Sequence, residues 1–211
     1  MITLLGKANS RASRNIWALL EAGADYQHDP IDYRKGEAKT DAFTAINPGA
    51  KIPALTDGDV AMFESLAMNL YIAQTYGKGS LWPDDSAGQA LCLQWTLFAA
   101  TELEPPSVSR LMEFIFKAEP DRDQVKIDAA AEQAKRPIDT LEATLAARKF
   151  LAGDAFTIAD LNVACVADYL LRTGFDFSPW PKTKAWLEGC LARDANQKTN
   201  DIRAKEAAAA A

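Results

Sequence analysis

Short apolar runs separated by turn-forming residues dominate the first third of the chain. Residues 2–5 are an apolar run that ends at a glycine, and they predict a buried strand. Apolar residues then recur at helical spacing within 11–22, and Gly23 is placed to end that helix. Residues 26–31 alternate weakly and predict a second strand, which a loop and a short helix follow over 32–46.

A β-hairpin is predicted next. Residues 54–56 and 60–63 can pair across an Asp57-Gly58 turn, because an Asp-Gly pair tolerates positive φ. Pro53 gives up one ladder donor, which requires an edge position or a cis Ile52–Pro53 bond. A cis bond would turn the backbone N–H and C=O of Ile52 outward, where an extended peptide can pair with them.

Two helix starts carry polar residues that suit either a cap or a ligand. Glu64 and Ser65 precede the apolar helix of residues 66–76, and they predict its acidic first turn and its cap. Ser10 lies where the first strand passes into the first helix, beside N–H groups that favour an anion. A serine at such a boundary is most often a helix cap. The residues alone leave open whether Ser10 is only a cap or also contacts a ligand.

From residue 86 onward the strand signals vanish and apolar residues recur at helical spacing. Gly77–Asp85, with two glycines, a proline and paired aspartates, is predicted to separate a first domain of residues 1–78 from an all-helical domain of residues 86–211. In the second domain Thr157 and Asp160 form a capping box, so Asp160 is interpreted as a folding determinant. The five terminal alanines either extend a helix or are an appended remnant.

Composition narrows the class of protein. With 211 residues, 48% hydrophobic and 25% charged, the chain is typical of a soluble globular protein. Its net charge is −6, from 23 basic and 29 acidic residues, which disfavours nucleic acid as a partner. No apolar run approaches the roughly 20 residues of a membrane span, and no basic region precedes an apolar one at the N-terminus. A cytoplasmic protein without membrane contact is expected.

Histidine and cysteine usage excludes several kinds of active site. His28 is the only histidine, which argues against histidine metal sites and against Ser-His or Cys-His catalysis. Cys92, Cys165 and Cys190 are scattered, and no Cys-x-x-Cys pair occurs. Neither a disulfide framework nor a dithiol redox enzyme is expected, and no metal is predicted.

Two segments resemble a known family. The run of Asn-Pro, Lys-Ile-Pro, Asp-Gly and Glu-Ser over Asn47–Ser65 resembles the glutathione-binding half of the cytosolic glutathione S-transferases. The Gly-x-x-Phe-Thr-Ile-Ala-Asp run at 153–160 is similar to one in their second domain. The resemblance covers about residues 1–190. It implies an α/β thioredoxin-like domain of order βαβαββα over 1–78 that binds glutathione. An all-α domain over 86–211 would carry much of the second-substrate site.

The resemblance extends to the bacterial, serine-type members, in which a serine after the first strand donates its hydroxyl hydrogen to the glutathione sulfur. Gly6–Ile16 resembles that segment, with Ser10 in the catalytic position and Ser13 as the rival one turn later. The first tyrosine is Tyr26 and the first cysteine is Cys92. The tyrosine-type and cysteine-type versions of the site therefore have no candidate in this loop.

The resemblance also implies how glutathione is held. The residue before the cis-proline pairs with the cysteinyl backbone, and the Glu-Ser pair holds the γ-glutamyl end. Basic or amide residues near the positions of Lys39 and Lys51 contact the glycyl carboxylate and the cysteinyl backbone in related transferases. The residues assigned to the glutathione site are Ser10, Lys39, Lys51, Ile52, Pro53, Glu64 and Ser65.

The expected activity is transfer of glutathione, as co-substrate, to a small and mostly apolar electrophile. The family resemblance also implies a homodimer, with Met62, Phe63 and the helix from Leu91 to Leu103 as contributors to its interface. Two alternatives share the fold: a non-catalytic binding or interaction module, and a glutathione-dependent reductase or dehalogenase. The sequence does not identify the electrophile.

Overall fold

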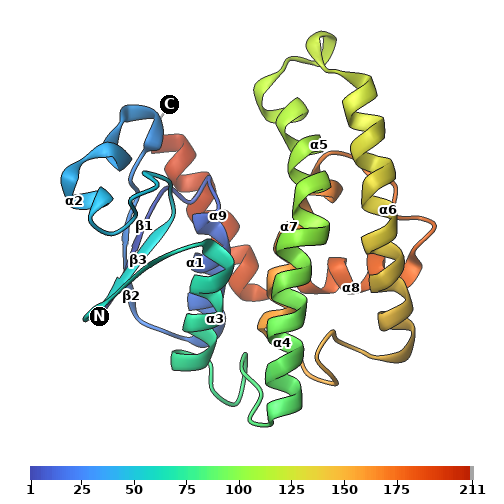
Figure 1. The fold of residues 1–211 in the computed structure, drawn as a ribbon, viewed down its shortest axis with the longest axis horizontal. Coiled ribbons are helices and arrows are strands. Elements are labelled where there is room, and N and C mark those ends of the chain that lie inside the picture. Colours follow the sequence, from blue (N-terminus) through green and yellow to red (C-terminus); the bar gives the residue numbers. More distant parts are fainter. Residues whose placement is uncertain (210–211) are drawn as a thin grey trace. The chain divides into compact units, whose positions relative to one another are not determined.

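The computed structural model describes residues 1–209, which form two compact units. One unit comprises Met1–Trp82 and the segment that begins at Arg193, and the other comprises Pro83–Ala192. The division falls inside the Gly77–Asp85 segment that was predicted to separate the domains (Figure 1). Among the described helices, none is long and apolar enough to cross a membrane.

A mixed four-stranded sheet forms the centre of the first unit. Its strands are β1 (Ile2–Leu5), β2 (Tyr26–Asp29), β3 (Ala54–Asp57) and β4 (Val60–Phe63), in the order β2-β1-β3-β4. β1 is parallel to β2 and antiparallel to β3, and β3 is antiparallel to β4. Its helices are α1 (Ala12–Ala22), α2 (Asp41–Thr44) and α3 (Ser65–Tyr76). This order confirms the predicted βαβαββα arrangement of a thioredoxin-like domain.

Side chains along each strand alternate between the two faces of the sheet, and other elements cover both faces. Leu4 and its partner Leu55 are fully buried on the face covered by α1 and α3 (Figure 1). Ala54 points to the opposite face, where it forms a buried cluster with Phe43 of α2. α1 ends at Gly23, whose φ of 64° confirms the predicted left-handed cap.

The hairpin turn differs by one residue from the prediction. Asp57 pairs with Val60, so the two turn residues are Gly58 and Asp59 rather than Asp57 and Gly58. Gly58 has a φ of 57°, while Asp59 keeps a negative φ. Asp57 stays in the strand, where its carboxylate accepts the hydroxyl hydrogen of Tyr71 at 2.9 Å.

Helix α9 (Asp194–Ala209) belongs to the first unit, although the sequence assigned residues 86–211 to the helical domain. Two contacts explain the difference. The guanidinium of Arg193 forms a bidentate ion pair with Glu21 of α1, at 2.6 and 2.8 Å, and Glu206 reaches the loop after β1. Figure 1 shows α9, in red, beside the blue α1. Three of the terminal alanines extend α9, and the last two lie outside the described residues.

The second unit is helical apart from one isolated bridge between Phe150 and Gly153. Its α-helices are α4 (Ser86–Phe98), α5 (Glu104–Phe116), α6 (Gln124–Ala147), α7 (Ile158–Arg172) and α8 (Pro181–Leu191). A π-helical segment, Ala99–Leu103, joins α4 to α5. It directly precedes the start of α5, where Pro105 and Pro106 lack N–H groups and their rings disfavour regular helix before them.

The capping box predicted at the start of α7 is confirmed. Thr157 donates its backbone N–H to Asp160 Oδ2 at 3.0 Å. The other carboxylate oxygen accepts the backbone N–H of Leu151 and the indole N–H of Trp186, each at 2.9 Å. Because Asp160 is fully buried, these donors make it an anchor of the helical core.

Candidate functional site

Gly6, the first residue of the loop that leads to Ser10, lies against the Ile52–Pro53 bond, which is cis as predicted. Gly6 has a φ of 134°, and a Cβ there would lie 3.0 Å from Cβ of Ile52 and 3.3 Å from Cα of Pro53. Glycine fits this conformation and this close approach, whereas a larger residue would not. The N–H of Gly6 also donates to the carbonyl of Asp29 at 2.8 Å. Two segments that the sequence singled out separately are therefore adjacent.

Ser10 is half-buried at the end of this loop, two residues before the first residue of α1. Its hydroxyl donates to the carbonyl oxygen of Lys7 at 2.6 Å and accepts the backbone N–H of Ala12 at 3.1 Å. Ser10 therefore acts on the first turn of α1 as a cap does. A hydroxyl has one donor and two acceptor lone pairs, so it can donate to a different acceptor while still accepting from Ala12. Capping and donation to a ligand are compatible at Ser10.

A hollow of about 240 Å³ opens beside Ser10. The residues that line it are Lys7, Asn9, Ser10, Asp32, Tyr33, Arg34, Glu206 and Ala207. Ser13 is not one of them, and its hydroxyl donates to the carbonyl oxygen of Ser10 at 2.9 Å within the first turn of α1. Of the two serines considered from the sequence, Ser10 is the one that borders the hollow.

An ion pair stands at the wall of the hollow. Lys7 Nζ lies 2.8 Å from Asp32 Oδ2, and the hydrogen bond from Lys7 lowers the pKa of Asp32. The second oxygen of Asp32 accepts the backbone N–H of Arg34 at 2.9 Å. Sequence analysis missed these residues. Their positions in the sequence could have indicated the pair. Lys7 and Asp32 each follow one strand of a parallel pair, and the carboxyl ends of such strands lie at the same edge of the sheet.

Ser65 is fixed by a buried polar network between α1 and α3. Arg14 Nη1 donates to Ser65 Oγ at 3.2 Å. Asn15 Nδ2 donates to the carbonyl oxygen of Ser65 and to Asn69 Oδ1, each at 2.8 Å. All four residues are buried, and Ser65 thereby connects to the helix that begins after Ser10. Sequence analysis missed Arg14 and Asn15, although an Arg-Asn pair directly before the buried Ile16 was a signal.

Glu64 does not cap α3 as the sequence predicted. It occupies the N-cap position, but its side chain makes no capping hydrogen bond, and Ser65 is the first residue of the helix. Its φ of 70° and ψ of 99° are unusual for a residue with a side chain. The carboxylate is exposed instead. Such backbone outliers concentrate at binding sites, so the outlier itself supports a functional role for Glu64.

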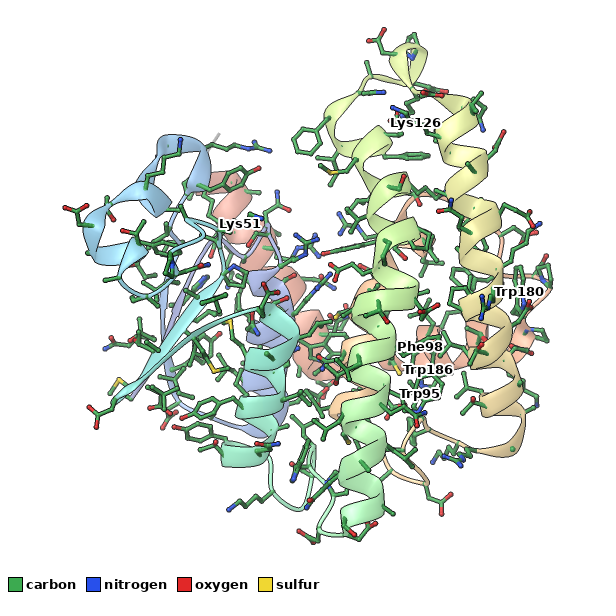
Figure 2. All side chains as sticks on the ribbon, viewed as in Figure 1. Lys51, Trp95, Phe98, Lys126, Trp180 and Trp186 are labelled. Carbon is green, nitrogen blue, oxygen red and sulfur yellow. The ribbon has the colours of Figure 1, made fainter. Side chains whose placement is uncertain are left out.

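The segment before β3 exposes Lys51 and holds its backbone firmly (Figure 2). Asn47 Nδ2 donates to the carbonyl oxygen of Lys51 at 2.6 Å, and Asn47 Oδ1 accepts the N–H of Gly49 at 3.0 Å. Among residues 1–209, no hydrogen bond engages the backbone N–H or C=O of Ile52. These two groups are the donor and the acceptor that an extended peptide needs for strand-like pairing.

Lys39 is the last residue of a short 3₁₀ turn, Glu37–Lys39, and its side chain is exposed. The preceding Ala38 is buried in the cluster with Ala54, against which Ile52 also packs. The residue before Lys39 and the side chain of Ile52 therefore pack in the same cluster. Within residues 1–209 no group of three or more His, Cys, Asp or Glu side chains is arranged to hold a metal ion.

The residues assigned from the sequence thus fall into one region of the first unit. Gly6 of the loop that ends at Ser10 contacts Ile52 and Pro53, and Ser65 is bonded to Arg14 of α1. The residues that line the hollow beside Ser10 include none of the other assigned residues. The region offers a hydroxyl at a helix start, an unpaired backbone edge and exposed charges of both signs. This combination suits an extended peptide that carries an ammonium, carboxylates and a group that benefits from a hydroxyl donor.

Comparison with known families gives two matches that together span most of the chain. Residues 1–74 match "Glutathione S-transferase, N-terminal domain", and residues 99–194 match "Glutathione S-transferase, C-terminal domain". Among curated proteins, a glutathione S-transferase of Hyoscyamus muticus is 34% identical over 95% of this chain and 98% of that protein. The glutathione S-transferase GstB of Escherichia coli (strain K12) is 30% identical over 94% of this chain and 97% of that protein.

Solved structures match over nearly the whole chain as well. Glutathione transferase F7 from Populus trichocarpa has a TM-score of 0.88 at 30% identity, covering 96% of this chain and 99% of that one. A glutathione S-transferase-I bound to lactoylglutathione has a TM-score of 0.87 at 30% identity, covering 95% and 99%.

Proposed function

The chain belongs to the glutathione S-transferase family, and we propose that it is a serine-type member in which Ser10 stabilises the thiolate of bound glutathione. It is a glutathione transferase with glutathione as its co-substrate. The observation that carries the serine-type assignment is the position of Ser10, which borders the hollow and ends the loop whose first residue, Gly6, lies against Ile52–Pro53. We also propose that the chain belongs to the bacterial, serine-type subclass that the sequence predicted.

Glutathione is proposed to bind along the edge of the first unit. The free backbone groups of Ile52, before Pro53, pair with the cysteinyl backbone, and Glu64 and Ser65 hold the γ-glutamyl end. The two exposed lysines, Lys39 and Lys51, supply the positive charge for a carboxylate. Local positive charge matters here because the protein as a whole carries a net charge of −6.

The chemical step needs the thiolate of glutathione, because the thiolate is the nucleophile. Ser10 would donate its hydroxyl hydrogen to the sulfur in place of the Lys7 carbonyl, while it still accepts from Ala12. A hydrogen bond to a charged group contributes about 1.5 to 3 kcal/mol. The N-terminus of α1 adds a favourable partial positive charge. Cysteine chemistry is not supported, because all three cysteines are buried and the first, Cys92, lies in α4.

The helical unit is proposed to carry much of the site for the electrophile. Helix α5 exposes Met112, Ile115 and Phe116, which suit a small apolar substrate.

We also propose a homodimer, supported by the exposed Phe63 of β4 and Leu97 of α4. A stable dimer would cover more than about 1,000 Å². Light scattering should then return twice the chain mass of 23.0 kDa. A cytoplasmic location is proposed as well, and the resemblance to cytosolic members supports it.

Substitution of Ser10 tests the proposed function directly. With glutathione saturating, the ultraviolet absorbance of its thiolate is measured against pH in the wild type, in Ser10→Ala and in Ser13→Ala. We expect Ser10→Ala to lower the thiolate fraction near neutral pH, and turnover with a panel of electrophiles, by about ten-fold or more. Ser13→Ala should leave both nearly unchanged. A thiolate lost in Ser13→Ala and kept in Ser10→Ala would transfer the role to Ser13.

A further inference from the structure

Helix α9 brings a carboxylate to the Gly6–Ser10 loop that the chemistry above does not use. Glu206 Oε2 accepts the backbone N–H of Ala8 at 2.8 Å. Its other oxygen, Oε1, lies 3.3 Å from Nδ1 of His28. The Glu206 and His28 side chains are only 19% and 17% exposed. Withdrawing a carboxylate from water is costly unless its partners compensate, so these contacts are specific features of the loop.

His28 extends the connection from Glu206 to Gly6. Its Nε2 lies 2.8 Å from the carbonyl oxygen of Gly6. A carbonyl oxygen can only accept, so Nε2 carries the hydrogen of this bond, and Nδ1 faces Glu206. The loop is therefore held at Gly6 by the imidazole and at Ala8 by the carboxylate.

The bond at Ala8 controls the direction of the group that Ser10 contacts. The N–H of Ala8 and the C=O of Lys7 belong to one peptide unit, which is planar. Glu206 accepts from the N–H end of this unit, and the Ser10 hydroxyl donates to its C=O end at 2.6 Å. Fixing one end of a planar group fixes the other. Glu206 thereby sets the orientation of the peptide beside the Ser10 hydroxyl.

We propose that Glu206 is a positioning residue for Ser10: by holding the Lys7–Ala8 peptide unit it fixes the loop that places the serine hydroxyl, which then exchanges the Lys7 carbonyl for the glutathione sulfur. His28 supports the same loop through Gly6. This inference rests on the thiolate role of Ser10 proposed above. It makes α9 a contributor to the reaction although Glu206 acts through the loop rather than on the thiol.

Charge and positioning predict effects of opposite sign. A carboxylate near a thiolate repels it, so charge alone predicts that removing Glu206 raises the thiolate fraction. Positioning predicts that the fraction falls. Glu206→Gln separates the two effects. Its amide oxygen can accept from Ala8, and its amide N–H can donate to Nδ1 of a neutral His28 that still donates from Nε2 to Gly6.

The test compares Glu206→Ala, Glu206→Gln, Ser10→Ala and the Ser10→Ala/Glu206→Ala double variant, using thiolate absorbance of bound glutathione and steady-state kinetics. We expect Glu206→Ala to lower the thiolate fraction at neutral pH and kcat by about three-fold to ten-fold. The KM for glutathione should change by less than about two-fold, because its proposed contacts remain. Glu206→Gln should restore most of the loss. In the Ser10→Ala background, Glu206→Ala should cause no further loss of thiolate or kcat.

Two controls keep the result interpretable. Asp201→Ala removes an exposed carboxylate from the same helix and should change neither quantity. Alanine is a good helix former, so Glu206→Ala retains α9, and Glu206→Asp repeats the test with a shortened side chain should that variant fail to fold. A thiolate fraction that rises or stays constant in Glu206→Ala, or effects that add in the double variant, would overturn the inference. An unaffected thiol in Ser10→Ala would instead overturn the proposed role of Ser10.

Discussion

The sequence predicts a polar cap at the N-termini of both α7 and α3, yet the two helix starts are built differently. At α7, Thr157 accepts the N–H of Ala159 at 3.3 Å, and Asp160 accepts the N–H of Thr157 in return. At α3, Glu64 occupies the cap position with positive φ, and its side chain makes no capping bond. Asp160 is fully buried, whereas Glu64 is exposed.

The difference separates residues that maintain the fold from residues that serve the site. The start of α7 satisfies its own N–H groups, and Asp160 connects it to the core through Trp186. At the start of α3, Arg14 of the neighbouring α1 donates to the Ser65 hydroxyl, and Glu64 adopts a costly backbone conformation. The first arrangement stabilises the helical unit. The second sacrifices stability where glutathione is proposed to bind.

The largest effect should follow from Asp160→Ala. The change leaves the buried donors of Leu151, Thr157 and Trp186 without their acceptor. We expect the free energy of unfolding to fall by about 3 to 5 kcal/mol, measured by urea denaturation. The exposed Asp201→Ala should stay within about 0.5 kcal/mol of the wild type. A loss below about 1 kcal/mol in Asp160→Ala would show that α7 does not depend on this anchor.

Thr157→Ala should act on stability alone. Loss of an N-cap side chain costs about 1 to 2 kcal/mol, which a lower urea midpoint will report. Glutathione affinity measured by titration calorimetry should not change, because Thr157 belongs to the helical unit and to none of the proposed glutathione contacts. Weaker binding in this variant would contradict the division between a structural and a binding helix start.

Glu64→Gly should have the smallest effect on stability, and an opposite one. Relief of the positive φ contributes about 1 to 2 kcal/mol, and the greater unfolded-state entropy of glycine removes about 0.5 to 1 kcal/mol of it. We expect a net gain of up to about 1 kcal/mol in the free energy of unfolding. Glutathione affinity in the same calorimetric titration should fall about ten-fold or more, as expected for loss of a charged contact. A variant that gained stability and kept its affinity would assign the outlier no role in binding.

Features that depend on neighbours in sequence could be predicted from the residues. The apolar run of β1, the glycine that ends α1 and the capping box at Thr157 each rest on a few adjacent positions, and the structure confirms all three. The segment Asn47–Ser65 carried the family resemblance, and through it the order of strands and helices. Local pattern and turn chemistry were sufficient for these.

Two features of the site could not be predicted, for different physical reasons. A glutamate gives no sign of positive φ, because only the surrounding structure imposes that conformation on Glu64. The bond from Ala8 to Glu206 joins residues 198 positions apart, which no periodicity encodes. For the same reason the segment that contains α9 was assigned to the helical domain, although it packs on α1.

The contact of Ala8 with Glu206 also has a consequence for biosynthesis. A ribosome adds about 5 to 20 residues per second, so about 10 to 40 s separate the synthesis of these two residues. During that interval the whole of Pro83–Ala192 emerges. The sheet can form early, but the loop that ends at Ser10 receives its acceptor only after the helical unit has been made. A nascent or prematurely terminated chain thus contains every proposed glutathione contact without the residue that completes the Ser10 loop.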